Sequence, residues 1–286
     1  MPDQAKGIFW SLVAGVLFVG VTGIVRHLGS DMNAVQSAFI RYVFGTLLFL
    51  PLYLQLMRAR TYPRQIGLHV LRGLVHGVGV MLWFYAMARI PIAEVTAIGF
   101  SAPIFVTIGA AMFLGERLHA RRITAVVFGF AGAIVILRPG VEAIQAGALA
   151  QLVAAPLFAI SMIVAKQLSR TESSAAIVAY LSVFVALVLA PPAMMVWRTP
   201  TLEETFWLFL TAVVATAGHY ALTLSFKYAE LTVLQPFTFL QLVWATLLGY
   251  YVFAEVPDAF TWVGGILIVA SASYIAHREA QLRERK

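Results

Sequence analysis

The chain contains one internal repeat, which constrains both of its halves to the same kind of fold. Residues 11–18, Ser-Leu-Val-Ala-Gly-Val-Leu-Phe, align with residues 151–158, Gln-Leu-Val-Ala-Ala-Pro-Leu-Phe, so the offset is 140 residues. The alignment continues to Arg26, which meets Lys166 near the end of the matching stretch. Self-similarity of this kind indicates a duplicated unit. The second half of the chain should therefore repeat the elements of the first.

Apolar stretches of about 20 residues recur along the chain, and such a stretch crosses the hydrocarbon of a bilayer as one α-helix. With 61% hydrophobic and 12% charged residues, the chain has more apolar surface than a soluble core of 286 residues can bury. A helix also satisfies its own backbone hydrogen bonds in lipid. The first stretch is too long and too rich in glycine for a cleaved signal peptide. We predict ten transmembrane helices, at residues 7–28, 33–56, 66–88, 92–114, 123–137, 146–168, 175–197, 205–228, 233–253 and 260–276.

The basic residues predict that the repeat is inverted. Ten spans give five per half, and an odd number makes the second half enter the membrane from the opposite side. With a cytoplasmic N-terminus, 14 of the 20 lysines and arginines fall on the cytoplasmic side and four outside, and two fall within spans. We therefore expect an all-α integral membrane protein with both termini in the cytoplasm. Its ten helices would form two inverted five-helix repeats around a central cavity, residues 1–140 and 141–286.

Several classes of function lack the residues that they need. The 13 aspartates and glutamates all fall in loops or near the ends of spans, so no mid-membrane acid is available for proton coupling. The chain has no cysteine, which excludes disulfides and thiolate metal sites. It also has no zinc motif and no phosphate-binding loop. We expect no enzymatic activity, no metal and no cofactor, and we read the net charge of +7 as a sign of membrane orientation, with no nucleic acid as partner.

Four polar side chains within the spans are candidates for function. His76 in the third span and His219 in the eighth could each bind a carboxylate or an amine, or titrate near neutral pH. Alternatively, each bonds a carbonyl or hydroxyl of a neighbouring helix. Arg72 and Arg41 are too costly to face lipid unpaired. They either face the interior, where Arg72 would bind an anion, or reach back to the nearer membrane surface.

Aromatic residues form the second group of candidates. Phe18 and Phe158 stand at equivalent positions of the repeat, and Phe237, Gln241 and Trp244 form a stripe at i, i+4 and i+7 of the ninth span. Such a stripe is also typical of ordinary helix packing. Aromatic rings could stack on a ring of the substrate, while histidine and glutamine bind its polar groups. The predicted substrate-binding residues are Phe18, His76, Trp83, Phe100, Phe158, His219, Phe237, Gln241 and Trp244.

The repeat extends to other spans. The fourth and ninth spans align at an offset of 139, which matches Glu116 with Glu255. Pro103 and Pro236 should interrupt these two spans and free backbone groups there. The third span aligned on the eighth matches Gly77 with Gly218. Gly73, Gly77 and the nearby Gly79 have a small-residue spacing, which we expect to serve close helix packing.

Five segments resemble the EamA family of the drug/metabolite transporter superfamily, and the resemblance covers the whole chain. They are Phe-Tyr-Ala-Met-Ala-Arg-Ile-Pro at 84–91, Ala-Pro-Ile-Phe at 102–105, Phe-Leu-Gly-Glu-Arg at 113–117, Phe-Ala-Glu-Val-Pro-Asp at 253–258 and Trp-Val-Gly-Gly at 262–265. The resemblance implies a carrier of the bacterial inner membrane with spans 1, 3, 4, 6, 8 and 9 around the cavity and spans 5 and 10 at the periphery. Members export amino acids, including aromatic ones, or carry riboflavin or S-adenosylmethionine. Small multidrug-resistance relatives have an acidic residue in the first span, which this chain lacks, so we expect either gradient-driven flux or coupling through a histidine.

The leading functional hypothesis is export of small metabolites by alternating access, with amino acids, including aromatic ones, as substrates. One alternative is an uptake or exchange carrier for a nucleotide-like or vitamin substrate, such as riboflavin or S-adenosylmethionine. An alternative of another class is a non-transporting membrane receptor or sensor. The expected partners are the small-molecule substrate and the lipid bilayer, and a monomer is the expected state.

Overall fold

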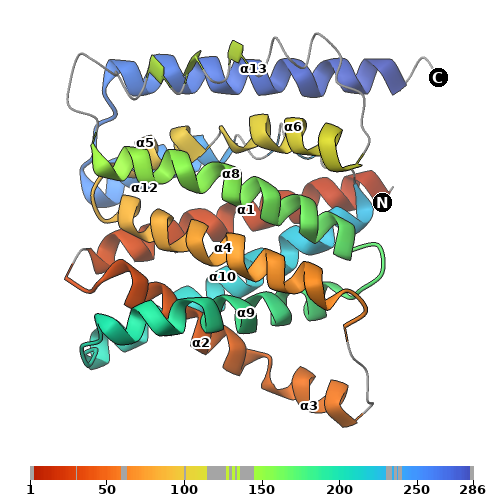
Figure 1. Cartoon of the computed structure of the whole chain (residues 1–286). Helices are drawn as coiled ribbons and strands as arrows, with labels where there is room; N and C mark the ends of the chain where they lie inside the picture. The colour runs from red at the N-terminus through yellow and green to blue at the C-terminus, as the bar shows by residue number, and fades with distance from the viewer. Residues whose placement is uncertain are drawn as a thin grey trace.

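The structure is a computed structural model that describes residues 3–29, 31–58, 63–99, 101–114, 127–128, 131–132, 134–135, 145–229, 234, 237 and 240–283. These residues form long helices that lie side by side, and both termini are at the right-hand end of the bundle in Figure 1. We call this the terminal end, and the other the opposite end. No strand occurs within the described ranges. The expectation of an all-helical chain is confirmed to that extent.

The helices follow the predicted spans closely. In the first half they are α1 (Asp3–Leu28), α2 (Ala34–Leu48), α3 (Leu50–Arg58), α4 (Ile66–Met87), α5 (Ile92–Gly99) and α6 (Ala102–Leu114). In the second half they are α8 (Ala146–Leu168), α9 (Ser174–Met195), α10 (Leu202–Tyr228), α12 (Leu240–Phe253) and α13 (Ala259–Arg283). Five of them, α1, α4, α8, α9 and α10, are each long and apolar enough to cross a bilayer. Of the fifth predicted span, 123–137, the structure describes only residues 127–128, 131–132 and 134–135.

Two predicted spans differ from continuous helices. The second span bends by 51° between α2 and α3, and together these two helices make a sixth candidate crossing. Pro51 explains the bend, because it has no N–H to donate to the carbonyl of Leu47. The fourth span is divided into α5 and α6, which end and begin on either side of residues 100–101. An interruption there was expected from Pro103.

Each half contributes helices that pack against the other half. The most extensive contacts join α1 to α10 and α4 to α8, and α2 packs mainly on α9. The halves are therefore interleaved, with the first helix of each half lying along a later helix of the other. α13 lies at the edge of the bundle against α5 (Figure 1). This matches the peripheral position expected for the tenth span.

Small residues allow the two main helix pairs to approach closely. A Cβ added at Gly218 of α10 would lie 3.1 Å from Cε1 of Phe18 on α1. A Cβ at Gly79 of α4 would lie 3.2 Å from Cε1 of Phe158 on α8. The expected packing role of the glycines is thus confirmed. The alignment is corrected, however: Gly79, and not Gly77, makes the contact that corresponds to Gly218, so the third and eighth spans align at an offset of 139.

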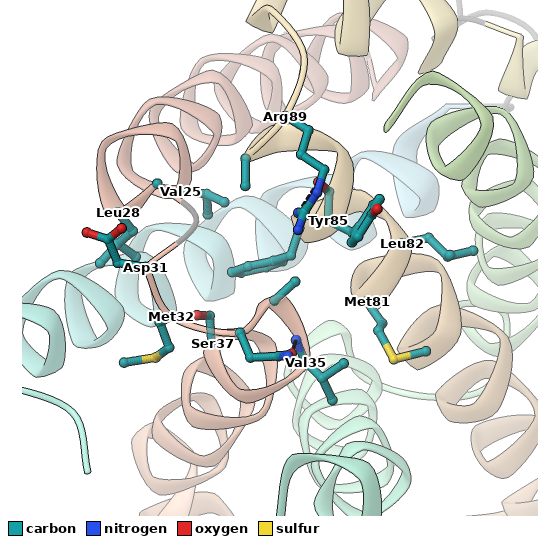
Figure 2. A pocket seen from close by; sticks show the side chains of 15 residues that line it. Val25, Leu28, Asp31, Met32, Val35, Ser37, Met81, Leu82, Tyr85 and Arg89 are labelled. Atoms are coloured by element: carbon teal, nitrogen blue, oxygen red, sulfur yellow. Dashed lines mark hydrogen bonds between the residues drawn. The ribbon is translucent and has the colours of Figure 1, made fainter. Parts of the chain in front are cut away.

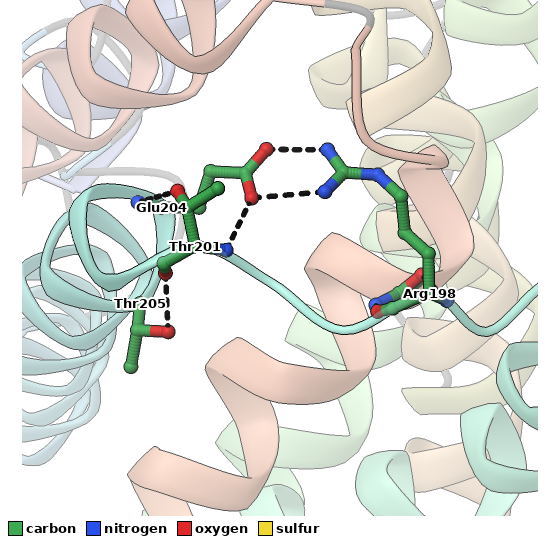
Figure 3. A network of polar contacts seen from close by, with 5 residues as sticks. Arg198, Thr201, Glu204 and Thr205 are labelled. Atoms are coloured by element: carbon green, nitrogen blue, oxygen red, sulfur yellow. Dashed lines mark hydrogen bonds and ion pairs between the residues drawn. The ribbon is translucent and has the colours of Figure 1, made fainter.

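A polar network fixes the loop between α9 and α10 at the opposite end (Figure 3). Arg198 forms an ion pair with Glu204, and its backbone exchanges hydrogen bonds with the side chain of Gln36 near the start of α2. The Thr201 hydroxyl accepts from the Glu204 N–H at 3.2 Å, and the Glu204 carboxylate accepts from the Thr201 N–H at 2.8 Å. This capping box satisfies backbone donors at the start of α10 and fixes that start against α2.

Candidate functional site

The two predicted histidines meet at the centre of the bundle. The ring centroids of His76 on α4 and His219 on α10 lie 5.1 Å apart, and the rings meet edge to face at 70°. One comes from each half of the chain. At an offset of 139 the counterpart of His219 is Val80, so the pair joins positions that are not equivalent in the repeat. The structure brings the histidines together, and their role in binding stays a prediction.

Each histidine is backed by a phenylalanine from the other half. Phe158 on α8 packs against His76 with the ring centroids 5.2 Å apart, and Phe18 on α1 packs against His219 at 5.0 Å. The two phenylalanines are equivalent in the repeat. The centre therefore consists of four rings in a row, Phe158, His76, His219 and Phe18. Edge-to-face contacts of this kind hold the rings in defined positions.

His76 shares a hydroxyl with a buried arginine. Its Nδ1 lies 3.0 Å from Oγ of Ser161, which also accepts a hydrogen bond from Nε of Arg72 at 3.3 Å. The arrangement favours a neutral His76 that accepts the Ser161 proton at Nδ1 and carries its own proton on Nε2. Nε2 is buried and has no hydrogen-bond partner among the described residues. Nε2 can therefore donate a hydrogen bond to an acceptor that the described residues do not supply.

The two arginines of the predicted spans are both buried in the structure. Arg41 is 5% exposed and Arg72 is 3% exposed, so both face the interior, and the alternative that they reach back to the membrane surface is wrong. Arg72 donates to the carbonyl of Ile177 at 3.1 Å. The guanidinium of Arg41 lies over the ring of Tyr42, 3.8 Å from the centroid. Arg72 shares the hydroxyl of Ser161 with His76, and the ring of Tyr42, on which Arg41 lies, is 6.2 Å from the ring of His76.

The four rings of this centre do not include the other predicted site residues. Gln241 on α12 faces α1, where a Cβ at Gly15 would lie 3.2 Å from its Cγ. Trp83 packs edge to face on Phe84 with the centroids 5.3 Å apart. Trp244 is 46% exposed. Phe237 is half-buried, and Phe100 lies outside the described residues.

Sequence reasoning missed two members of the central cluster. Ser161 is one hydroxyl among many in apolar spans, and its only signal is that it follows Phe158 by three residues on the same helix face. Tyr42 stands next to Arg41, but adjacent residues of a helix do not face each other in general, so the sequence gives no reason to pair them. The ring of Tyr42 lies 6.2 Å from that of His76.

A pocket of about 480 Å³ lies at the opposite end of the bundle (Figure 2). It lies between the end of α1, the start of α2 and the end of α4, and its volume is within the range of small-molecule sites. Arg89 borders it, with its guanidinium 3.7 Å from the ring centroid of Tyr85, and Asp31 also lines it. Ser37 lines the pocket, and Arg41 follows one turn deeper on the same face of α2.

A network around Glu255 joins several helix ends at the opposite end of the bundle. The carboxylate of Glu255 forms an ion pair with Arg26 at 2.5 Å and accepts from the N–H of Ile92 at 2.8 Å. Arg26 donates in addition to the carbonyl of Met87 at 3.1 Å. These contacts join the end of α1, the end of α4, the start of α5 and the residues before α13.

A similar contact lies at the terminal end. Lys166 donates to the carbonyl of Phe226 at 2.6 Å and to that of Ala229 at 3.1 Å. Lys166 is the repeat counterpart of Arg26, and Phe226 is the counterpart of Met87. Glu116, the counterpart of Glu255, lies outside the described residues. The same basic position therefore binds the end of the equivalent helix at each end of the bundle.

Comparisons with known proteins match the chain over nearly its full length. The profile of the EamA-like transporter family matches residues 5–138 and again residues 145–276. An S-adenosylmethionine uptake transporter of Rickettsia bellii is 29% identical over 98% of this chain and 96% of its own length. A riboflavin transporter of Rhizobium johnstonii is 30% identical over 100% of this chain and 95% of its own, and a pseudopaline exporter of Pseudomonas aeruginosa is 28% identical over 93% and 94%.

A solved crystal structure has the same fold. It covers 98% of this chain and 98% of its own with a TM-score of 0.67, at 17% sequence identity. At that identity the similarity concerns the fold alone. The chain is thus similar in sequence to transporters of three different substrates and in structure to a known fold.

Proposed function

The chain belongs to the EamA-like transporter family, and from this premise we propose that it carries a small metabolite with a heteroaromatic ring by alternating access, with the central histidine pair as substrate site. It is a transporter of the bacterial cell membrane, as its relatives are. The observation that carries the proposal is the row of four rings from both halves, in whose middle Nε2 of His76 has no hydrogen-bond partner among the described residues. A site shared by two halves changes its exposure when the halves move relative to each other.

The relatives favour one of the substrate hypotheses over another. Amino-acid export was expected from the aromatic residues, but the relatives reported above are named for S-adenosylmethionine, riboflavin and pseudopaline. S-adenosylmethionine and riboflavin each contain a heteroaromatic ring system, which suits a site between Phe18 and Phe158. We therefore propose a substrate of this kind first, with aromatic amino acids second. Names of uptake and of export both occur among the relatives, so the direction is part of the test.

Alternating access supplies a role for the two closing contacts. We infer that the halves form an inverted repeat of ten helices, residues 1–140 and 141–286, with both termini in the cytoplasm. The network of Glu255 with Arg26 would then close the outer side, and the contact of Lys166 with Phe226 the inner side. Opening one side breaks one set of contacts while the other holds. With no carboxylate among the described residues of the central cluster, a substrate gradient or histidine protonation would drive transport.

Transport by the purified protein tests the proposal. Proteoliposomes would be loaded on either side with radiolabelled S-adenosylmethionine, riboflavin, tryptophan or phenylalanine, and saturable flux measured in both directions. We expect saturable flux of at least one heteroaromatic compound, and a loss of more than about tenfold in His219→Leu, which removes a polar ring from the site. His27→Gln is the matched control, because His27 packs on Trp207 at the end of α1. Absence of saturable flux for all four compounds would contradict the proposal and favour a receptor.

A further inference from the structure

Two buried positive charges near the histidine pair have no acidic partner among the described residues. Arg41 on α2 and Arg72 on α4 are both at least nine-tenths buried. Their contacts within the described ranges are to neutral groups: Arg72 donates to Ser161 and to the carbonyl of Ile177, and Arg41 lies on the ring of Tyr42. These contacts satisfy donors but leave the net charge uncompensated. A buried cation without a counter-charge is strongly destabilising in a protein, and more so within a membrane.

An acid from the turn between α8 and α9 contacts α4 at another residue. Glu172 forms a hydrogen bond of 2.8 Å with Nε2 of His69, one turn nearer to the terminal end than Arg72. Within the described ranges it makes no ion pair with Arg72 or Arg41. Within the described ranges the two arginines thus lack a counter-charge, and a bound ligand with an acidic group would supply one.

Two further polar atoms beside the arginines have no partner in the part of the chain that the structure describes. They are the hydroxyl of Tyr42 and Nε2 of His76, and both are buried. Tyr42 lies under Arg41 and 6.2 Å from the ring of His76, so the four groups are neighbours. Guanidinium, hydroxyl and imidazole N–H groups are all donors to oxygen anions. The cluster thus offers an anion two positive charges and, as far as the described residues go, a buried imidazole N–H beside a buried hydroxyl.

The pocket at the opposite end lies on the same side of α2 as this cluster. Ser37 lines the pocket, and Arg41 follows one turn deeper on the same helix face. Arg89 at the border of the pocket adds a positive charge there, and Asp31 a negative one (Figure 2). An acid that enters the pocket would find Arg41 as the next basic group along α2.

We propose that Arg41 and Arg72 form the subsite for an acidic group of the substrate, a carboxylate or a phosphate, next to the ring site of the two histidines. This inference rests on the proposed function, since it specifies the substrate of the same central site. It divides the candidate substrates into those with an acidic group and those without one. A metabolite with a ring and an acid fits, and the same ring without an acid leaves two buried charges unpaired.

Matched ligand pairs test the subsite on the wild-type protein. The pairs are S-adenosylmethionine and its decarboxylated form, tryptophan and tryptamine, and riboflavin phosphate and riboflavin. Binding to the purified full chain in nanodiscs would be measured by titration calorimetry. In each pair of which at least one member binds, we expect the compound with the carboxylate or phosphate to have at least about tenfold higher affinity than the compound without it. The first two pairs report on a carboxylate and the third on a phosphate.

Substitutions assign that preference to the arginines. Arg41→Gln and Arg72→Gln should lose about tenfold or more in affinity for the acid while the partner compound binds as before, and Arg41→Lys should keep part of the preference. Arg170→Gln, an exposed arginine after α8, is the control for loss of charge alone. Should the glutamine variants fail to fold, the wild-type comparison decides alone.

The outcomes separate the two proposals. If a compound is bound and transported but its decarboxylated or dephosphorylated partner binds equally well, the acidic subsite is wrong and the proposed transport function stands. If none of the six compounds binds, both are wrong. If the acids bind more tightly and the preference disappears in the glutamine variants but persists in Arg170→Gln, the subsite is established.

Discussion

Arg26 and Lys166, which are equivalent in the repeat, make the same kind of contact at opposite ends of the bundle. Each donates to a carbonyl at the end of a helix, Arg26 to Met87 and Lys166 to Phe226. The equivalent contacts stand beside a centre that is not symmetric, because His76 and His219 occupy different repeat positions. The contacts of Arg26 and Lys166 thus follow the repeat, whereas the residues of the proposed substrate site do not.

The closure at the opposite end can be weakened selectively. Glu255→Gln removes the ion pair with Arg26, and we expect the opposite end to be open about fivefold more often, since a partly exposed ion pair contributes about 1 kcal/mol. The chain has no cysteine, so a single Ser37→Cys in the pocket reports opening through its rate of maleimide labelling. Glu172→Gln at the other end is the control. Equal labelling rates with and without Glu255→Gln would refute a role in closure.

Close packing at Gly73 should tolerate no side chain. A Cβ there would lie 2.3 Å from Cβ of Phe184 and 3.2 Å from its backbone carbon, so α4 and α9 would have to move apart. Gly73→Ala should therefore destabilise the protein by about 1–3 kcal/mol. Gly67→Ala on the same helix is the matched control, because nothing lies within 4 Å of its Cβ. Thermal unfolding in detergent should show a lower midpoint for Gly73→Ala and an equal or higher one for Gly67→Ala.

The hydroxyl of Ser161 links the histidine site to the buried arginine. Ser161→Ala removes the hydrogen bonds to both His76 and Arg72, and we expect about a tenfold loss in substrate affinity together with lower stability. Ser161→Thr keeps the hydroxyl and should retain most of the affinity. Calorimetric titration of both variants with the best ligand is the measurement. Equal affinities for Ala and Thr would show that the hydroxyl does not position the site.

The start of α10 depends on one side chain. Thr201→Ala breaks the capping box with Glu204 and should lower the free energy of unfolding by about 1 kcal/mol, the usual value of an N-cap. Thr205→Ala removes only a hydroxyl bonded to the carbonyl of Thr201 and serves as the comparison. Unfolding curves of the two variants should differ in midpoint. Coincident curves would show that the network around Arg198 holds α10 without its cap.

Much of the fold can be predicted from the sequence, because a membrane-spanning helix appears there as one long apolar stretch. The stretches that became α1, α4, α8, α9 and α10 are long, apolar and self-satisfied in hydrogen bonding, so their limits could be predicted within a few residues. The bend between α2 and α3 was missed, although Pro51 provides a reason for it. Hydropathy predicts which stretch of the chain crosses the membrane, but it does not predict where the helix bends.

The centre was predicted in part. His76, His219, Phe18 and Phe158 were all chosen from the sequence, and they lie together. Their pairing was beyond reach, because each phenylalanine contacts the histidine of the other half, and no spacing along the chain encodes contacts between halves. The burial of Arg41 and Arg72 could not be predicted for the same reason. Whether a long basic side chain turns inward depends on the groups that neighbouring helices offer, such as Ser161 and the carbonyl of Ile177.

The interleaving of the two halves has a consequence for biosynthesis. α1 is made first, yet the helix along which it packs most extensively, α10, begins only at residue 202. α4 likewise waits for α8. The first half therefore enters the bilayer without the neighbours that will cover its inward faces, and its tertiary structure can form only after the second half has been synthesised. Truncated chains that end before α8 would leave Arg72 without Ser161 and Ile177, and so should be substrates for membrane quality control.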